Sequence, residues 1–138
     1  MDTKTIVFTA PQTAEFIAAK TKPMTANSVA VKMEYTVVSG GTERACIMAL
    51  PNAGTSFPKY LGYCGVGHVV EIGEQVTSVQ PGDRVLVYHG RHSQYNVVPE
   101  IKVKPIISRV VKPEEAPRIY KELCNDPLFP MGTVFDWR

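Results

Sequence analysis

Ser-Val-Ala-Val-Lys-Met-Glu-Tyr-Thr-Val-Val-Ser, residues 28–39, is the stretch that most clearly indicates how this chain folds. Its larger apolar side chains recur at every second position: Val29, Val31, Met33, Tyr35 and Val37. The residues between them are smaller or polar: Ala30, Lys32, Glu34 and Thr36. A period of two is expected when one face of a β-strand is buried. The stretch therefore predicts a strand with one face toward a core.

Shorter strand candidates lie on both sides of this stretch, at residues 5–8, 14–18, 65–72, 84–88 and 94–98. Turn residues separate them, among them Gly40-Gly41 and Pro81-Gly82-Asp83. Several short strands with such breaks predict a mostly β fold, either a small barrel or a sandwich. A short helix through Met48 is also expected.

The pattern changes after residue 99. Pro113-Glu114-Glu115 opens a stretch in which Ala116, Ile119, Tyr120 and Leu123 fall at helical spacing, so one C-terminal helix is predicted. The segment from Asn125 to Gly132 is expected to end this helix. Residues 133–137 then predict a closing strand.

The composition of the chain excludes several functional classes. A chain of 138 residues is long enough for one domain, 1–138, and its 44% hydrophobic and 20% charged residues are typical of a folded protein. Fifteen basic and thirteen acidic residues are scattered, which argues against a nucleic-acid surface. No segment is apolar enough to cross a membrane. Three cysteines without CxxC spacing suit a reducing compartment, so a cytoplasmic location is predicted.

Three motifs in order resemble the medium-chain dehydrogenase/reductase family, which includes the zinc-type alcohol dehydrogenases. Ser39-Gly40-Gly41-Thr42-Glu43-Arg44 is similar to the family's Cys-Gly-Thr-Asp segment, and closer to a subgroup with Ser-Pro-Gly-Thr-Glu-Arg. Residues 61–73 resemble the Gly-His-Glu stretch with its following strand, and Gly82-Asp83-Arg84-Val85 matches a Gly-Asp-Arg-Val turn. Ile107-Ser108-Arg109, the helix from Pro113 and Asp136-Trp137-Arg138 look like the family's C-terminal segment.

The resemblance implies a GroES-like fold: a partly open β-barrel with a short helix and one C-terminal helix. It also implies a deletion near residues 100–101. In the family, a Rossmann domain of roughly 100 to 200 residues is inserted there, between segments that correspond to Val98-Pro99-Glu100 and Ile101-Lys102-Val103. The chain is thus expected to be the substrate-side domain of an NAD(P)-dependent oxidoreductase, inactive by itself.

No cofactor site is predicted within the chain. Gly62, Gly65 and Gly67 have the spacing GxxGxG, the reverse of the dinucleotide fingerprint, and they lead into a strand rather than a helix. We interpret them as positions of a tight β corner. The resemblance implies that NAD(P) binds to the intact enzyme, on the missing domain.

Zinc binding is not favoured either. Gly40, or Ser39 after a one-residue slip, stands where the family's catalytic cysteine would be, and Tyr63 and Cys64 replace its His-Glu pair. The remaining candidate cluster consists of Glu43, Cys64, His89 and His92. Residues three apart on a strand point to opposite faces, so the two histidines would need a curled loop to share a metal ion.

The resemblance implies that Thr42, Glu43 and Tyr63 line the substrate cleft of the intact enzyme. A structural alternative is that Thr42 caps the short helix and that the helix dipole favours Glu43. Tyr63 beside a glycine corner could equally be a packing residue. His68 is expected to be a partly buried, hydrogen-bonded side chain of a strand.

Two functional classes therefore remain. The first is the oxidoreductase domain that acts on a small-molecule substrate only when intact, and loss of its partner domain would expose an apolar face that favours homodimers. The second is a stand-alone GroES-like binding or interaction module without enzymatic activity.

Overall fold

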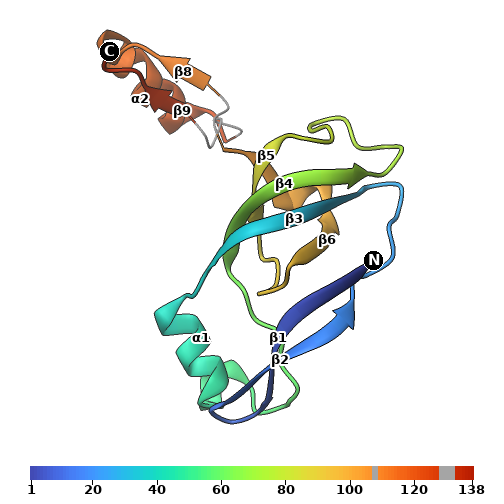
Figure 1. Ribbon diagram of the computed structural model, residues 1–138. Coiled ribbons are helices and arrows are strands. Elements are labelled where there is room, and N and C mark those ends of the chain that lie inside the picture. The colour runs from blue at the N-terminus through green and yellow to red at the C-terminus, as the bar shows by residue number, and fades with distance from the viewer. Residues whose placement is uncertain (107–108, 128–132) are drawn as a thin grey trace.

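The strand predicted from residues 28–39 is the central strand of the main sheet. In the computed structural model, which describes residues 1–106, 109–127 and 133–138, β3 (Ser28–Val37) pairs with β6 (Tyr95–Pro99) on one side and β4 (Cys64–Ile72) on the other. Beyond β4 come β5 (Arg84–Tyr88) and β7 (Val103–Pro105), which gives a five-stranded antiparallel sheet in the order β6-β3-β4-β5-β7. Figure 1 shows this sheet as a strongly curved layer.

The connection between the two edge strands proves that the sheet curls. β6 and β7 are joined by one 3-10 turn, η2 (Glu100–Lys102). Four residues of extended chain reach at most about 14 Å, whereas the edges of a flat five-stranded sheet would lie about 19 Å apart. The sheet therefore bends its edges toward each other, and the predicted partly open barrel is confirmed.

Valines fill the core inside this curl. Those that are 2% exposed or less come from four of the five strands: Val29, Val31, Val69, Val85, Val87 and Val103. β-branched side chains pack well on a pleated, buried surface, which is why these segments form strands.

The alternation predicted for β3 fails at both ends of the strand: its first four residues, 28–31, are all buried, and its last residues are largely exposed. Val29 and Val31 are fully buried, but Tyr35 is 70% and Val37 52% exposed, so the prediction of one continuous buried face is wrong. The pairing of β3 with β4 shifts register between Ala30 and Val31 and again between Met33 and Tyr35. Each irregularity changes the face of the sheet to which the following side chains point. Every second residue of β3 therefore no longer points into the core.

A separate hairpin covers one side of the barrel. β1 (Asp2–Ala10) and β2 (Thr13–Lys20) pair antiparallel, and single bridges tie β1 to Ser93 and Lys59. After β3 the chain enters α1 (Gly40–Ile47) and the 3-10 turn η1 (Pro51–Ala53), which Figure 1 shows at the hairpin end of the molecule. The expected short helix is thus confirmed.

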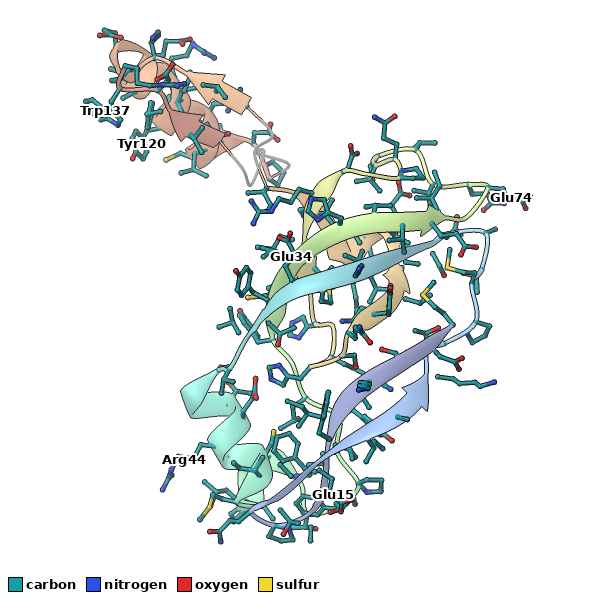
Figure 2. The ribbon with its side chains drawn as sticks, in the orientation of Figure 1. Glu15, Glu34, Arg44, Glu74, Tyr120 and Trp137 are labelled. Carbon is teal, nitrogen blue, oxygen red and sulfur yellow. The ribbon has the colours of Figure 1, made fainter. Side chains whose placement is uncertain are left out.

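The C-terminal residues form a small unit that lies beyond the barrel in Figure 1. β8 (Arg109–Val111) and β9 (Thr133–Phe135) pair in parallel, with the 3-10 turn η3 (Pro113–Glu115) and α2 (Ala116–Asn125) in sequence between them. The predicted C-terminal helix is confirmed, but its first turn at Pro113 is a 3-10 turn. Figure 2 shows Tyr120 and Trp137 on this unit, where they are 58% and 81% exposed.

Some predictions fall on residues outside the described part of the chain. These are Ile107 and Ser108 of the tail resemblance and the last residues, 128–132, of the segment expected to end the helix. Within the described residues, no helix has the length and apolar character needed to span a membrane.

Candidate functional site

A buried hydrogen-bonded pair links the short helix to a distant loop. Glu43 of α1 and His92 of the loop between β5 and β6 are each 6% exposed, and His92 Nε2 lies 2.9 Å from Glu43 Oε2. The other ring nitrogen, Nδ1, lies 2.8 Å from Thr36 Oγ1 on β3. A threonine hydroxyl can donate or accept, so both ring nitrogens are satisfied in the neutral and the protonated imidazole.

The second oxygen of Glu43 holds the start of its own helix. The backbone N–H of Ser39 donates to Glu43 Oε1 at 3.0 Å, and the carboxylate lies in the first turn, where the helix dipole favours negative charge. Thr42 is exposed, and the helix begins at Gly40 with Ser39 as its N-cap. The alternative that Thr42 caps this helix is therefore wrong, because the helix starts three residues earlier than a cap at Thr42 requires.

Three aromatic rings gather at the ends of β4 and β5. The hydroxyl groups of Tyr63 and Tyr88 lie 2.8 Å apart, and the ring of His89 packs edge-on against both tyrosines, with centroids 5.4 Å and 4.3 Å away. The hydrogen bond from Tyr63 raises the pKa of Tyr88, so the Tyr88 phenol keeps its proton at neutral pH. The pair is 40% and 38% exposed and can present an O–H donor to a ligand.

Backbone hydrogen bonds join the buried pair and the aromatic cluster into one framework. His92 N donates to Leu61 O at 2.8 Å and His89 N donates to Tyr63 O at 2.7 Å, so the segment before β4 runs beside the loop after β5. Glu43 and Tyr63, both predicted for the cleft, are therefore held by the same loop. Tyr88 was missed from the sequence, and only its place opposite Cys64 in the β4–β5 register reveals its role.

The candidate metal cluster is not assembled. Glu43 reaches His92, but His89 packs in the aromatic cluster and Cys64 lies in β4. In the part of the chain that the structure describes, no three His, Cys, Asp or Glu side chains come together as metal ligands. His92 also has both ring nitrogens hydrogen-bonded, so it has no free lone pair for zinc. These residues do not fit a zinc site.

The glycines near β4 are positions of close backbone approach. A Cβ atom at Gly62 would lie 2.8 Å from the backbone of Arg91, and one at Gly65 or Gly67 would collide with the carbonyl oxygens of Tyr35 and Lys32. The space beside each glycine is therefore filled by a neighbouring strand or loop. Gly65 and Gly67 lie within β4 and not at a corner, so of the interpretation only the close backbone approach is confirmed.

A wide groove opens beside the buried pair. Its volume is about 350 Å³, and it reaches Thr36 and His92 between the apolar side chains of Phe16, Met33 and Tyr35. Thr42, Glu43 and Tyr63 do not line this groove. The three cleft candidates thus lie in different surroundings: Thr42 is exposed on a helix, Glu43 is buried in a hydrogen-bonded pair, and Tyr63 is half exposed in an aromatic cluster.

Comparison with protein families identifies the barrel. The sequence model of the alcohol dehydrogenase GroES-like domain matches residues 25–105, which is more than half of the chain. The match begins just before β3 and ends with β7, so it covers the whole five-stranded sheet. A search of curated proteins found no match.

Solved structures share the same fold. A short chain alcohol dehydrogenase from Escherichia coli in complex with NADH superposes with a TM-score of 0.65 at 20% identity, over 78% of this chain and 39% of that one. The quinone oxidoreductases from Coxiella burnetii and Pseudomonas syringae each give 0.64, at 18% and 24% identity, over 78% and 77% of this chain. This chain spans 38% and 34% of their lengths.

Proposed function

Because this chain belongs to the alcohol dehydrogenase GroES-like domain family, we propose that it is the substrate-side domain of an NAD(P)-dependent oxidoreductase and transfers no hydride by itself. The turn η2 carries this proposal. It joins β6 directly to β7 at residues 100–102, where the dehydrogenases that the chain resembles insert a nucleotide-binding domain. Hydride transfer needs a nicotinamide cofactor held against the substrate, and that task would belong to the other domain.

The geometry of η2 supports an insertion point. Ile101 is 80% exposed, while the strands on both sides of the turn are paired within the sheet. An inserted domain with neighbouring ends can leave such a surface turn without disturbing the strands, because the host core does not depend on the loop. The single domain with a deletion near residues 100–101 is therefore part of the proposal.

The substrate would meet an aromatic, hydrogen-bonding surface. The Tyr63–Tyr88 pair offers a protonated phenol, which can donate to the carbonyl oxygen of a substrate. The buried Glu43–His92 pair would fix the loop that carries His89 beside these rings. Thr42 and Glu43 then shape the cleft from the helix, with Glu43 acting through its hold on that loop.

The nucleotide titration is the direct test. Purified chain is titrated with NADH and NADPH while nicotinamide fluorescence is followed, and no saturable change is expected. A chimera with the nucleotide-binding domain of the NADH-bound relative inserted at Glu100–Ile101 is then assayed for NADH oxidation with a quinone, the substrate class named for two structural relatives. Hydride transfer by the chain alone, or an inert chimera that binds NADH, contradicts the proposal.

Self-association is the second part of this proposal. Tyr35, Val37 and Val38 form an exposed apolar strip at the end of β3, 70%, 52% and 69% exposed. Contiguous apolar surface of this kind favours contact with another protein. We expect concentration-dependent dimers in sedimentation experiments, and Val38→Lys should shift them to monomers; an unchanged monomer at all concentrations contradicts this part.

A further inference from the structure

A cavity of about 290 Å³ lies on the side of the barrel where the hairpin meets β6. Its wall combines the start of β1, the end of β2 with the two residues after it, and most of the segment from His89 to Pro99, together with Tyr60 and Lys102. This volume is close to the lower end of the range for small-molecule sites, about 300 to 1,000 Å³. The cavity contains none of the residues proposed for the substrate cleft except His89, so it is a different site.

The charged side chains that line this cavity are all basic. Four cationic side chains line it, Lys20, Lys22, Arg91 and Lys102, and its lining holds no aspartate or glutamate. Asp2 is the cross-strand neighbour of Lys20, but it does not line the cavity. None of the four cations forms an ion pair with a carboxylate of the described residues. Four positive charges around one hollow attract an anion.

Arg91 is held in place rather than free to move. The buried side chain of Asn96, 5% exposed, accepts from Arg91 N at 2.8 Å and donates to Arg91 O at 3.1 Å. The guanidinium lies over the ring of Tyr60, 4.4 Å from its centroid. The backbone of Arg91 is thus fixed and its guanidinium is stacked on a ring, so its N–H groups are preorganised to donate to an anionic oxygen.

The wall also offers uncommitted polar groups. Thr21 Oγ1 is buried at the cavity wall and has no hydrogen-bond partner among the described residues. Among the described residues, Lys102 Nζ donates to one acceptor, the carbonyl oxygen of His89 at 3.3 Å, which leaves two of its three protons for a ligand. A buried hydroxyl without a partner costs stability, and a bound oxygen atom would remove that cost.

We propose that this cavity binds a small organic anion that carries two or more negative charges on phosphate or carboxylate groups. Several cations that converge on a preformed hollow suit a multiply charged ligand better than a single carboxylate. Phosphate and carboxylate oxygens both accept hydrogen bonds from lysine and arginine, so the cavity can recognise either class of anion in the same way.

Calorimetric titration of the full chain tests the proposal. Inorganic pyrophosphate and citrate serve as the probes in low-salt buffer, and we expect one saturable site whose affinity falls as sodium chloride is added. Binding of pyrophosphate alone assigns the site to phosphates, and binding of citrate alone assigns it to carboxylates. Absence of saturable binding for both probes overturns the proposal.

Single substitutions distinguish binding in this cavity from nonspecific electrostatic attraction of anions to the protein. Lys22→Gln and Arg91→Gln should each weaken binding about tenfold, whereas Lys32→Gln, an exposed lysine of β3 outside the cavity, should stay within about twofold. Lys22 makes no side-chain hydrogen bond in the described residues, so this variant should fold normally. An equal loss in the Lys32 variant overturns the proposal.

The outcome can be told apart from that of the proposed function. Dinucleotides also contain a pyrophosphate group, so any NADH binding found in the titration is challenged with excess pyrophosphate. Binding of NADH that excess pyrophosphate removes belongs to this cavity. Binding of NADH that pyrophosphate leaves unchanged contradicts the absence of a nicotinamide site and says nothing against the anion site.

Discussion

His92 Nε2 lies 2.9 Å from Glu43 Oε2, and both side chains are almost completely buried. The two residues are 49 positions apart in the chain, on a helix and on a loop. Their contact connects the start of α1 to the loop that carries His89 and Arg91, so it supports both the aromatic cluster and the wall of the basic cavity.

Removal of either partner of this pair should be costly. Glu43→Ala and His92→Ala each leave a buried polar or charged group unpaired, so we expect a loss of about 3 to 5 kcal/mol in the free energy of unfolding. The double variant should cost less than the sum, which urea unfolding measures. Glu34→Ala removes the half-exposed contacts of Glu34 with Arg84 and His68 and serves as control, with an expected loss below about 1 kcal/mol. Equal losses in Glu43→Ala and Glu34→Ala would contradict a structural role for the buried pair.

Lys59 should stabilise the helical segment between β3 and β4. Its Nζ donates to three backbone carbonyl oxygens, those of Cys46 at 2.8 Å, Ala53 at 3.3 Å and Gly54 at 2.7 Å. Lys59→Met keeps the length of the side chain but removes these charged hydrogen bonds, and we expect a loss of about 1.5 to 3 kcal/mol. Thermal unfolding measures it; an unchanged melting temperature would show that water replaces the ammonium at no cost.

Two glycines should respond in opposite ways to the same substitution. Gly67→Ala would drive a methyl group into the carbonyl of Lys32 on the neighbouring strand, and overpacking of this kind costs about 1 to 3 kcal/mol. Gly41→Ala meets open space on a helix and should gain up to about 1 kcal/mol. Chemical unfolding of both variants checks the pair. A neutral Gly67→Ala would mean that β3 and β4 can separate at this point.

The stability of the η2 turn should depend on pH through Glu100. Hydrogen bonds from Ser78 and from the backbone N–H of Thr77 hold the pKa of Glu100 below its ordinary value. The lowered pKa means that the ionised form stabilises the fold above the unfolded-state value, about 4.3, and that this contribution is lost as the pH falls through the folded-state value.

Glu100→Gln should therefore be less stable than the parent chain at pH 7, and the difference should shrink in acid. Unfolding by urea at several pH values between about 7 and 3 measures this difference. Glu74→Gln, at an exposed turn without a side-chain hydrogen bond in the described residues, is the matched control and should show a difference near zero throughout. A constant difference for Glu100→Gln would mean that the turn does not depend on the carboxylate.

The sequence alone determined the class and order of the elements. Period-two patterns and glycine or proline breaks located four of the five strands of the main sheet and missed the short β7, and the motifs around Thr42, Gly65 and Gly82 pointed to the family that the comparison then identified. These signals are local, since strand pairing and tight turns select residue types over a few neighbouring positions.

Only the tertiary structure decided which side chains meet. No local pattern says that Glu43 reaches His92, that Tyr88 joins Tyr63, or that Lys22 and Arg91 border one cavity. The exposure of Tyr35 also escaped the sequence, because the register shifts between β3 and β4 arise from the pairing of two strands. Local periodicity determines where a strand forms along the chain. The curl of the sheet and its irregular pairing determine which residues from distant segments come into contact.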